Sequence, residues 1–303
     1  MNKHDEYYRQ VQLLLRILPL IYRIDDFAVH GGTAINLFHR NMPRYSVDID
    51  LTYIPVAGRE ESMAAINLHL AELKKNIERI VPGIRIIHKQ DVWKLLCMYD
   101  MVTVKIEVNG TKRGLLGEAE IKTLCEAAVN EFHLSTKCRT VSFTQLYGGK
   151  IAAALSRQHP RDLFDCKYLM EDTPFDKVRD GLLFCLAGSD KPIHESILPH
   201  DVNQQDALEK QFAGMTDVPF TYEQYEQTRQ ELHHYVLDGF TSNDKSFLVS
   251  FEQGEPNWSL CAAGDLSNYP SVRWKLLNLN KLKQDNPIKL QEEADKLKAI
   301  LIS

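Results

Sequence analysis

The hydrophobic pattern of the chain changes near residue 145, and this change limits the possible folds more than any other feature. In the first half, apolar and polar residues alternate in short segments such as 101–108, which is typical of strands with one buried face. Beyond 171 these segments fade and apolar residues recur at helical spacing, as in 222–239. The pattern predicts an α/β domain with a mixed sheet flanked by helices over 1–145, and a mainly helical domain over 146–303.

Individual elements follow from the same periodicities. Strands are expected at 27–30, 47–54, 84–88, 93–99, 101–108 and 139–143, with a hairpin-type turn at Asn109-Gly110. Helices are expected at 6–24, 34–39, 60–80, 143–158, 161–170, 175–187, 222–239, 271–282 and 288–300. The stretch 240–268 is expected to be irregular and rich in turns.

Composition excludes several classes of protein. With 44% hydrophobic and 25% charged residues, the 303-residue chain is not disordered and can bury a large core. The longest apolar stretch, 13–24, contains two arginines and a proline and falls short of the ~18–20 residues that a membrane helix needs. The N-terminus has no signal core, and the six cysteines form no CxxC pair. We therefore expect a cytoplasmic protein without disulfides or membrane association.

The net charge of −5 argues against a general nucleic-acid binder, which is usually basic. The charge is unevenly spread, however, because residues 171–255 hold 17 Asp/Glu against 6 Lys/Arg. The rest of the chain is therefore mildly basic, and an RNA substrate is not excluded. The acidic block is expected either to face away from RNA or to receive a basic partner.

The first chemical signal is Gly31-Gly32-Thr33, which lies between a predicted strand and a predicted helix. Glycines let a backbone approach a ligand closely, and a helix N-terminus attracts anions. Thr33 adds a hydroxyl group. The turn is thus a candidate phosphate site, and a plain strand-to-helix turn is the alternative.

The second signal is a set of carboxylates on predicted strands. Asp48 and Asp50 project from one face of their strand, ~7 Å apart at the Cα atoms, and would repel each other unless a cation such as Mg²⁺ lay between them. Glu107 completes a three-carboxylate cluster if its strand lies beside theirs, and such a cluster holds two Mg²⁺ ions. The alternatives are incidental acids facing solvent, and an edge-strand Glu107 paired with Lys105 or Lys94.

The third signal lies at the start of the helical half. Lys150 and Arg157 are two turns apart on one helix face, where small alanines leave room for a phosphate or a base. Asp162 and Asp165 follow on the next helix. Asp165 is flanked by apolar residues and needs a partner such as Lys150 or Arg161. A solvated helix face and a structural salt bridge are the alternatives.

Taken together, these segments form an ordered series of motifs: Gly31-Gly32-Thr33-Ala34-Ile35, Arg44-x-Ser46-x-Asp48-Ile49-Asp50-Leu51, Lys150-x-x-Ala-x-x-x-Arg157, Arg161-Asp162-x-x-Asp165-x-x-x-Leu169, Pro256-x-Trp258 and Pro270-x-x-x-Trp274. Their order and spacing resemble the AbiEii/AbiGii toxin family. Those proteins, among them the MenT group, are nucleotidyltransferase-like toxins of the DNA polymerase β superfamily.

The resemblance implies a polymerase-β-like nucleotidyltransferase fold and an NTP substrate used with Mg²⁺. In the best-understood members a nucleotide is moved to the 3′ end of tRNA, which blocks translation, and a cognate antitoxin neutralises the toxin. By this resemblance Asp48, Asp50 and Glu107 would bind metal, and Glu107 would also help to deprotonate the acceptor. Lys150 would neutralise triphosphate charge, with Asp165 orienting it. The nucleotide-binding set would be Gly31, Gly32, Thr33, Arg44, Ser46, Lys150, Arg157 and Asp162.

The sequence departs from the family pattern in two places. Gly-Gly-Thr replaces the superfamily's Gly-Ser, so Thr33 or the backbone would take the serine's role. Glu107 replaces an aspartate as third carboxylate, with Asp100 as the alternative. Other members modify proteins or act with kinase-like chemistry, and aminoglycoside-modifying relatives nucleotidylate small molecules. A catalytically silent module that binds RNA or a partner is a further possibility, which the intact Asp48, Asp50 and Lys150 argue against.

Overall fold

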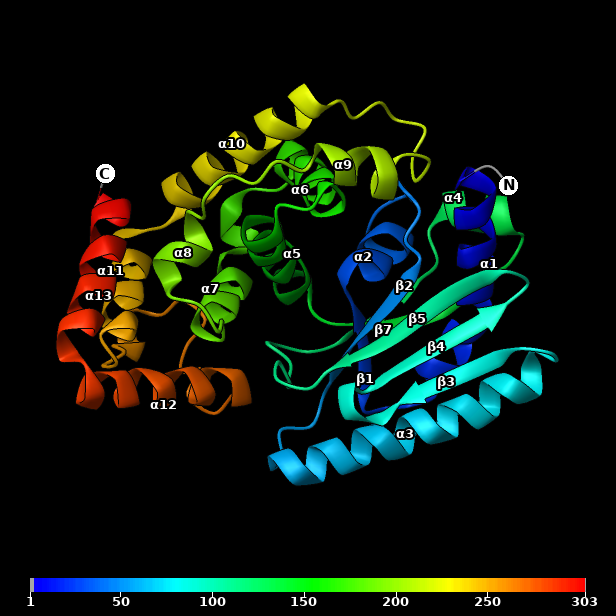
Figure 1. Ribbon diagram of the computed structural model, residues 1–303, viewed down its shortest axis with the longest axis horizontal. Coiled ribbons are helices and arrows are strands. Elements are labelled where there is room, and N and C mark those ends of the chain that lie inside the picture. Colours follow the sequence, from blue (N-terminus) through cyan, green and yellow to red (C-terminus); the bar gives the residue numbers. More distant parts are fainter. Residues whose placement is uncertain (1–2, 303) are drawn as a thin grey trace. The chain divides into compact units, whose positions relative to one another are not determined.

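The computed structural model describes residues 3–302 (Figure 1), and contacts divide the chain into two compact units. The first comprises Met1–Ser142 with Phe212–Pro219, and the second comprises Phe143–Gln211 with Phe220–Ser303. The segment 212–219 belongs to the first unit because its backbone and side chains bond there. Tyr45 N donates to the Met215 carbonyl at 2.7 Å, and Thr216 Oγ1 donates to the Pro43 carbonyl at 2.8 Å. The domain limits 1–145 and 146–303 stay a prediction.

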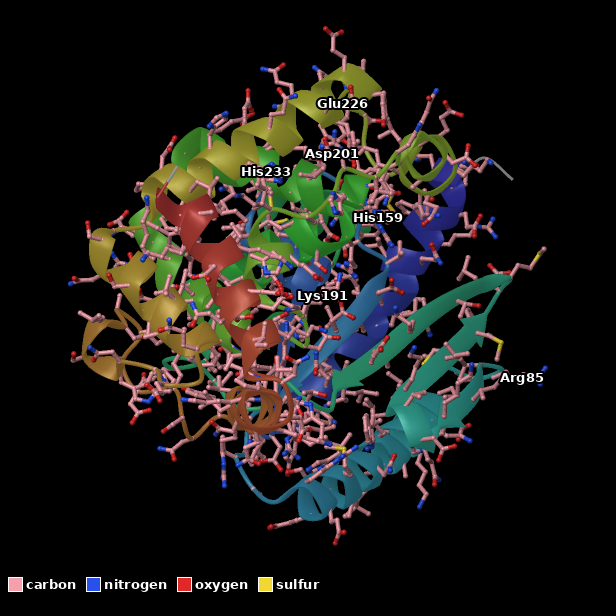
Figure 2. The ribbon with its side chains drawn as sticks, turned by 60° about the vertical axis from the view of Figure 1, so that its left-hand side comes forward. Arg85, His159, Lys191, Asp201, Glu226 and His233 are labelled. Carbon is pink, nitrogen blue, oxygen red and sulfur yellow. The ribbon has the colours of Figure 1, made fainter. Side chains whose placement is uncertain are left out.

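The first unit is built on a mixed seven-stranded sheet with the order β3-β4-β5-β2-β1-β7-β6. β2 runs parallel to β5 and antiparallel to β1, which in turn runs parallel to β7. Arg85 points to solvent from β3 at one edge (Figure 2). The strands are β1 (Phe27–His30), β2 (Asp48–Tyr53), β3 (Arg85–Lys89), β4 (Lys94–Tyr99), β5 (Val102–Asn109), β6 (Glu120–Thr123) and β7 (Lys137–Thr140).

The two faces of this sheet differ in character. α1 contacts β5 and α3 contacts β3 and β4, so these helices cover the face on which Ile49, Leu51 and Ile106 are fully buried. Alternation then places Asp50 and Glu107 on the opposite face. The helical elements of this unit are α1 (Lys3–Tyr22), α2 (Gly31–Ala34), its π-helical continuation η1 (Ile35–His39), α3 (Arg59–Ile80), η2 (Gln90–Val92) and α4 (Glu126–Phe132).

The second unit is helical in all its described elements. α10 and α11 each begin with a capping box, on Thr221 and Thr241, whose side chains accept from the backbone three residues on. The elements are α5 (Phe143–Arg157), α6 (Pro160–Asp172), η3 (Phe175–Lys177), α7 (Arg179–Ala187), α8 (Ile193–Ile197), α9 (Gln205–Ala207), η4 (Leu208–Phe212), α10 (Tyr222–Gly239), α11 (Ser242–Glu252), η5 (Trp258–Leu260), α12 (Pro270–Asp285) and α13 (Pro287–Ile302).

The prediction of a hairpin at Asn109-Gly110 is wrong, because β5 does not pair with the next strand, β6. β5 is followed by a loop, in which Asn109 Oδ1 accepts from the backbone of Thr111 and Lys112. Gly110 is needed for another reason, because a Cβ there would lie 2.4 Å from the Trp93 ring. The hairpin between β4 and β5 instead turns at Asp100 and Met101, both with positive φ.

Several elements were not predicted from the sequence. They are β6, α4 and α11, together with the short α8, α9, η2, η4 and η5. The stretch 240–268, predicted to be irregular, contains the eleven-residue α11. Its capping signal was readable, since Thr241 is followed three residues later by Asp244. Among the described residues, none of the helices is both long and apolar enough to cross a bilayer, and no cysteine pair forms a disulfide.

The crossing of α5 and α7 depends on two glycines and gives a test of the packing. A Cβ on Gly148 would lie 2.1 Å from the Gly181 carbonyl carbon, whereas one on Gly149 would meet only Cys185 Sγ, at 3.9 Å. We expect Gly148→Ala to lower the free energy of unfolding by at least about 1–3 kcal/mol because the helices must move apart. Gly149→Ala should be neutral or raise it by up to ~1 kcal/mol through helix propensity. Urea unfolding measures both, and equal effects would contradict the close crossing.

Candidate active site

The strand register brings the predicted carboxylates together on one face of the sheet. β2 pairs in parallel with β5 so that Asp50 lies opposite Glu107 and Asp48 opposite Lys105. Neighbouring strands are about 4.8 Å apart, so these side chains are direct neighbours. β5 lies between β4 and β2, so Glu107 is not on an edge strand. The strand of Glu107 therefore lies beside that of Asp48 and Asp50, as a three-carboxylate cluster requires.

Lysine ammonium groups contact two of these carboxylates, Asp48 and Glu107. Lys105 Nζ lies 3.7 Å from Asp48 Oδ2 and 3.4 Å from Glu107 Oε2, and Lys94 Nζ lies 3.1 Å from the same Glu107 oxygen. Burial lowers the pKa of Lys105, but Asp48, Asp50 and Glu107 together outweigh it, and the pKa is raised. A cation is thus favoured at this face, which fits a divalent metal held by oxygen ligands.

The side chains of this cluster are partly open to solvent. Those of Asp48 and Glu107 are 31% and 38% exposed, so an ion or a nucleotide can reach them. The ion pairs of Glu107 with Lys105 and Lys94, set out above as the alternative reading, occur alongside the cluster. Their presence leaves the metal-binding role of Glu107 a prediction, and it adds Lys105 to the site.

Asp100 does not join this cluster. It sits in the turn between β4 and β5, at the opposite end of β5 from Glu107. Its side chain is 65% exposed and pairs with Arg9 at 3.3 Å. Two residues were candidates for the third carboxylate. Glu107 lies next to Asp50, and Asp100 does not.

Gly31 and Gly32 allow the first turn of α2 to pack against the carboxylate face. Gly31 has φ +70°, and a Cβ there would lie 2.7 Å from Asp50 Oδ2. A Cβ on Gly32 would lie 2.8 Å from Ser46 Oγ and 2.9 Å from Arg44 Nη2. Gly31 is favoured by its positive φ, and the side-chain atoms beside both glycines would have to shift to admit a Cβ.

Three polar side chains beneath this turn are buried and bonded within the protein. Thr33 Oγ1 donates to the Asp48 carbonyl and lies 3.1 Å from Ser46 Oγ. Arg44 is 3% exposed, and its Nη1 donates to the Tyr45 carbonyl at 2.8 Å. These bonds fix the start of β2 against α2. The contacts of Thr33, Arg44 and Ser46 with a nucleotide stay predictions.

A second cluster lies within the helical unit, where α5 meets α6. Lys150 Nζ contacts Asp162 Oδ1 at 2.8 Å and Asp165 Oδ2 at 2.9 Å, so Lys150 is the partner that Asp165 required. Asp162 Oδ2 also accepts from Arg157 Nη2 at 2.8 Å. The turn between the helices is set by His159, whose Nδ1 accepts from the Arg161 backbone as an N-cap ahead of Pro160.

The members of this second cluster differ in their exposure to solvent. The side chains of Lys150 and Asp165 are 6% and 0% exposed, while that of Arg157 is 65% exposed. Arg157 is therefore open to an anion from solvent. Lys150 and its aspartates form a buried ionic network in which each charge is paired.

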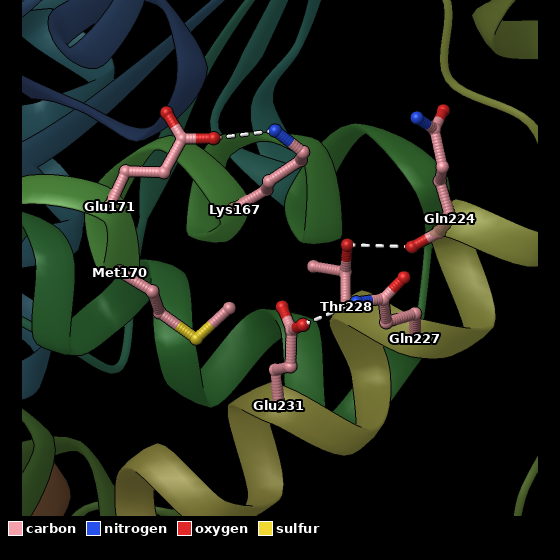
Figure 3. A pocket seen from close by; sticks show the side chains of 7 residues that line it. All are labelled: Lys167, Met170, Glu171, Gln224, Gln227, Thr228 and Glu231. Atoms are coloured by element: carbon pink, nitrogen blue, oxygen red, sulfur yellow. Dashed lines mark hydrogen bonds and ion pairs between the residues drawn. The ribbon is translucent and has the colours of Figure 1, made fainter.

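A separate groove between α6 and α10 has no member of either cluster (Figure 3). Lys167 follows Asp165 by two residues, which turns its side chain about 200° around the helix, away from Lys150. Nearby, Arg229 of α10 pairs with Asp201 at 3.1 Å, and Figure 2 shows Asp201 beside this helix. The groove is lined by Lys167, Met170, Glu171, Gln224, Gln227, Thr228 and Glu231.

Comparison with known proteins decides the family. The sequence model described as "Nucleotidyl transferase AbiEii toxin, Type IV TA system" matches residues 12–276. The chain belongs to the AbiEii nucleotidyltransferase toxin family. The resemblance inferred from the motifs is thereby confirmed, and this AbiEii protein is a nucleotidyltransferase toxin of a type IV toxin–antitoxin system.

A solved structure agrees with the fold of this AbiEii protein. MenT4, a nucleotidyltransferase toxin from Mycobacterium tuberculosis H37Rv, matches with a TM-score of 0.61 and 14% identity, over 91% of this chain and 94% of MenT4. At that identity the likeness establishes the fold, as predicted from the sequence. No curated protein matches the sequence. Family membership implies an NTP substrate, an antitoxin partner and, as nucleotidyltransferases generally require, a divalent metal.

Lys105 offers a test of the carboxylate face that does not depend on catalysis. Without metal, Lys105→Met should lower the free energy of unfolding by up to about 1 kcal/mol, because three acids lose a partly exposed counter-charge. Added Mg²⁺ should then raise the Tm of Lys105→Met more than that of the parent. Lys122→Met is the matched control, since Lys122 pairs with Glu120 on β6, at 2.8 Å. Equal Mg²⁺ responses in the two variants would contradict the site.

Lys150 tests the buried network. Lys150→Ala should cost about 3–5 kcal/mol of unfolding free energy, because the buried Asp165 loses its cation and Asp162 keeps only its contact with Arg157. Lys150→Met combined with Asp165→Asn should recover part of that loss, as one buried charge is removed from each side. Lys167→Ala, which breaks an exposed pair with Glu171, should cost under ~1 kcal/mol. Urea unfolding measures the free energy of unfolding of each variant. A loss below ~1 kcal/mol for Lys150→Ala would exclude a tightly paired network.

Proposed function

We propose that this toxin transfers a nucleotide from an NTP to the 3′ end of tRNA in a Mg²⁺-dependent reaction and so blocks translation. The observation that carries the proposal is the face formed by Asp48, Asp50 and Glu107 beside the Gly31-Gly32 turn. Family membership gives the reaction class, and the grouping of these carboxylates supports the proposal that the reaction takes place beside them.

The acidic side chains have distinct parts in this proposal. Asp48 and Asp50 would hold Mg²⁺, with Glu107 as the third ligand, and the metal would offset the charge of the triphosphate and of the transition state. Glu107 accepts the proton of the acceptor hydroxyl. The acceptor oxygen then bonds to the α-phosphorus while the bond to the leaving pyrophosphate breaks. The backbone at Gly32 and Thr33 holds the outer phosphates.

The basic residues have two kinds of role. Lys150 neutralises triphosphate charge, with Asp162 and Asp165 fixing its ammonium group through the contacts at 2.8 and 2.9 Å. Arg157, whose side chain is 65% exposed, guides phosphate or the tRNA end in this proposal. Arg44 stays in the proposed nucleotide-binding set; it is 3% exposed and lies beside Gly32.

An RNA acceptor is compatible with the charge distribution of the chain. The acidic excess lies in 171–255, and the motif-bearing segments before it are mildly basic. A tRNA acceptor predicts that binding weakens steeply with added salt, because phosphate contacts release counterions. A small-molecule acceptor predicts a much weaker salt dependence, so the same titration separates the two acceptors.

The direct test is transfer of label. The protein is incubated with tRNA, Mg²⁺ and each of the four α-labelled NTPs, and the 3′ ends of the tRNA are sequenced. We expect added nucleotides at those ends, loss of the product with EDTA, and a drop of about 10²–10³-fold or more for Asp50→Asn. Asp100→Asn is the matched control and should keep the parent's activity.

The possible outcomes separate the parts of the proposal. Label on a protein or a small amine would refute the tRNA acceptor and keep nucleotidyl transfer. No label on any acceptor, together with an Asp48→Ala variant as toxic as the parent, would refute the enzymatic proposal altogether.

A further inference from the structure

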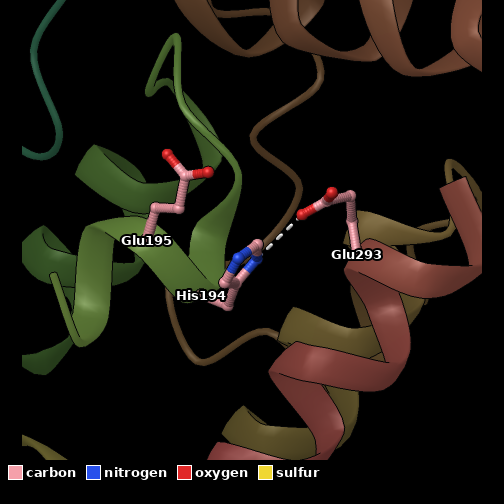
Figure 4. A group of neighbouring side chains, drawn as sticks. All are labelled: His194, Glu195 and Glu293. Atoms are coloured by element: carbon pink, nitrogen blue, oxygen red, sulfur yellow. Dashed lines mark ion pairs between the residues drawn. The ribbon is translucent and has the colours of Figure 1, made fainter. Parts of the chain in front are cut away.

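A group of metal-ligating side chains lies in the helical unit, apart from the Lys150 cluster. His194 and Glu195 are adjacent on the short helix α8, and Glu293 faces them from α13 (Figure 4). One ligand atom from each of the three lies within 4.8 Å of the other two. None of the sequence motifs described above includes these residues, because His194 and Glu293 are 99 positions apart in the sequence.

The spacing already suits a metal centre. His194 Nδ1 lies 3.3 Å from Glu293 Oε2. A tetrahedral zinc with bonds of 2.0–2.1 Å places its ligand atoms about 3.3 Å apart, so this pair needs no rearrangement. Glu195 is exposed on the surface, and its side chain can close the remaining distance by rotating.

The burial of Glu293 provides a second, independent observation. Glu293 is 8% exposed, and its Oε2 is a buried oxygen with no hydrogen-bond donor among the described residues. His194 Nδ1 is also buried without a hydrogen-bond partner. The other oxygen, Glu293 Oε1, is paired with Lys296 at 3.2 Å. A buried polar atom without a hydrogen-bond partner is unfavourable, and here two such atoms lie 3.3 Å apart.

We propose that His194, Glu195 and Glu293 bind a divalent transition-metal ion, Zn²⁺ foremost. One imidazole nitrogen and two carboxylates form a donor set that suits Zn²⁺, whereas Mg²⁺ takes oxygen ligands. The ion satisfies both orphaned atoms and offsets the two carboxylate charges that Lys296 only partly balances. Water would supply any further ligand. The site ties α8 to α13 and is independent of the proposed nucleotidyl transfer.

The test measures Zn²⁺ binding without using activity. Calorimetric titration of Zn²⁺ alone is carried out on the full chain with Asp48→Asn and Asp50→Asn, which weaken the carboxylate face as a competing site. We expect one Zn²⁺ per chain, and a rise in Tm with Zn²⁺ that Mg²⁺ does not reproduce. Co²⁺ at the same site should show the visible absorption of a centre with a nitrogen ligand.

Variants locate the bound ion. His194→Ala and Glu195→Gln should each weaken Zn²⁺ binding at least tenfold, and the exposed position of Glu195 ensures that its variant folds. Glu292→Gln is the matched control, because it removes the same charge one residue away on the exposed side of α13. Loss of affinity at His194 and Glu195 no greater than at Glu292, or no Zn²⁺ bound at all, would show that His194 and Glu293 form only a local pair and would overturn the proposal.

Discussion

The parallel pairing of β2 with β5 is the constraint on which the rest of the first unit depends. Its register places Asp50 opposite Glu107, and at the same time it turns Ile49, Leu51 and Ile106 into the core under α1. A slip of one residue would exchange the faces, burying carboxylates among aliphatic side chains. The same strand register therefore determines both which residues form the core and which carboxylates lie together on the opposite face.

The two units hold their acidic residues in opposite ways. On the sheet, Asp48 and Glu107 stay partly exposed, and the lysines beside them bond at 3.1–3.7 Å, a range from which an incoming metal can displace them. In the helical unit, Lys150 and Asp165 are closed off from solvent and contact each other at 2.9 Å. The first arrangement suits exchange of a bound ion, and the second suits a fixed geometry.

How far the sequence could predict this structure depends on how local each signal is. The strand of Asp48 and Asp50 and the helix of Lys150 were predicted because their periodicity lies within a few residues. The role of Lys105 could be recognised only once the register of two distant strands was known. From the sequence alone, Lys94 and Lys105 are only possible ion-pair partners of Glu107. β6 and α4 are short and lack clear periodicity, whereas α11 was missed although its cap was present at Thr241.

The return of residues 212–219 to the first unit has a consequence for any attempt to separate the two halves of this protein. The Met215 carbonyl and the Thr216 hydroxyl bond to the backbone around Tyr45, directly ahead of the strand that carries Asp48. A fragment ending at residue 145 would lack these partners, and the backbone around Tyr45 would be exposed to water. The sheet and the helices are thus interleaved along the chain, and a working split protein would need its cuts at Ser142, Gln211 and Pro219 with the middle piece supplied to the sheet.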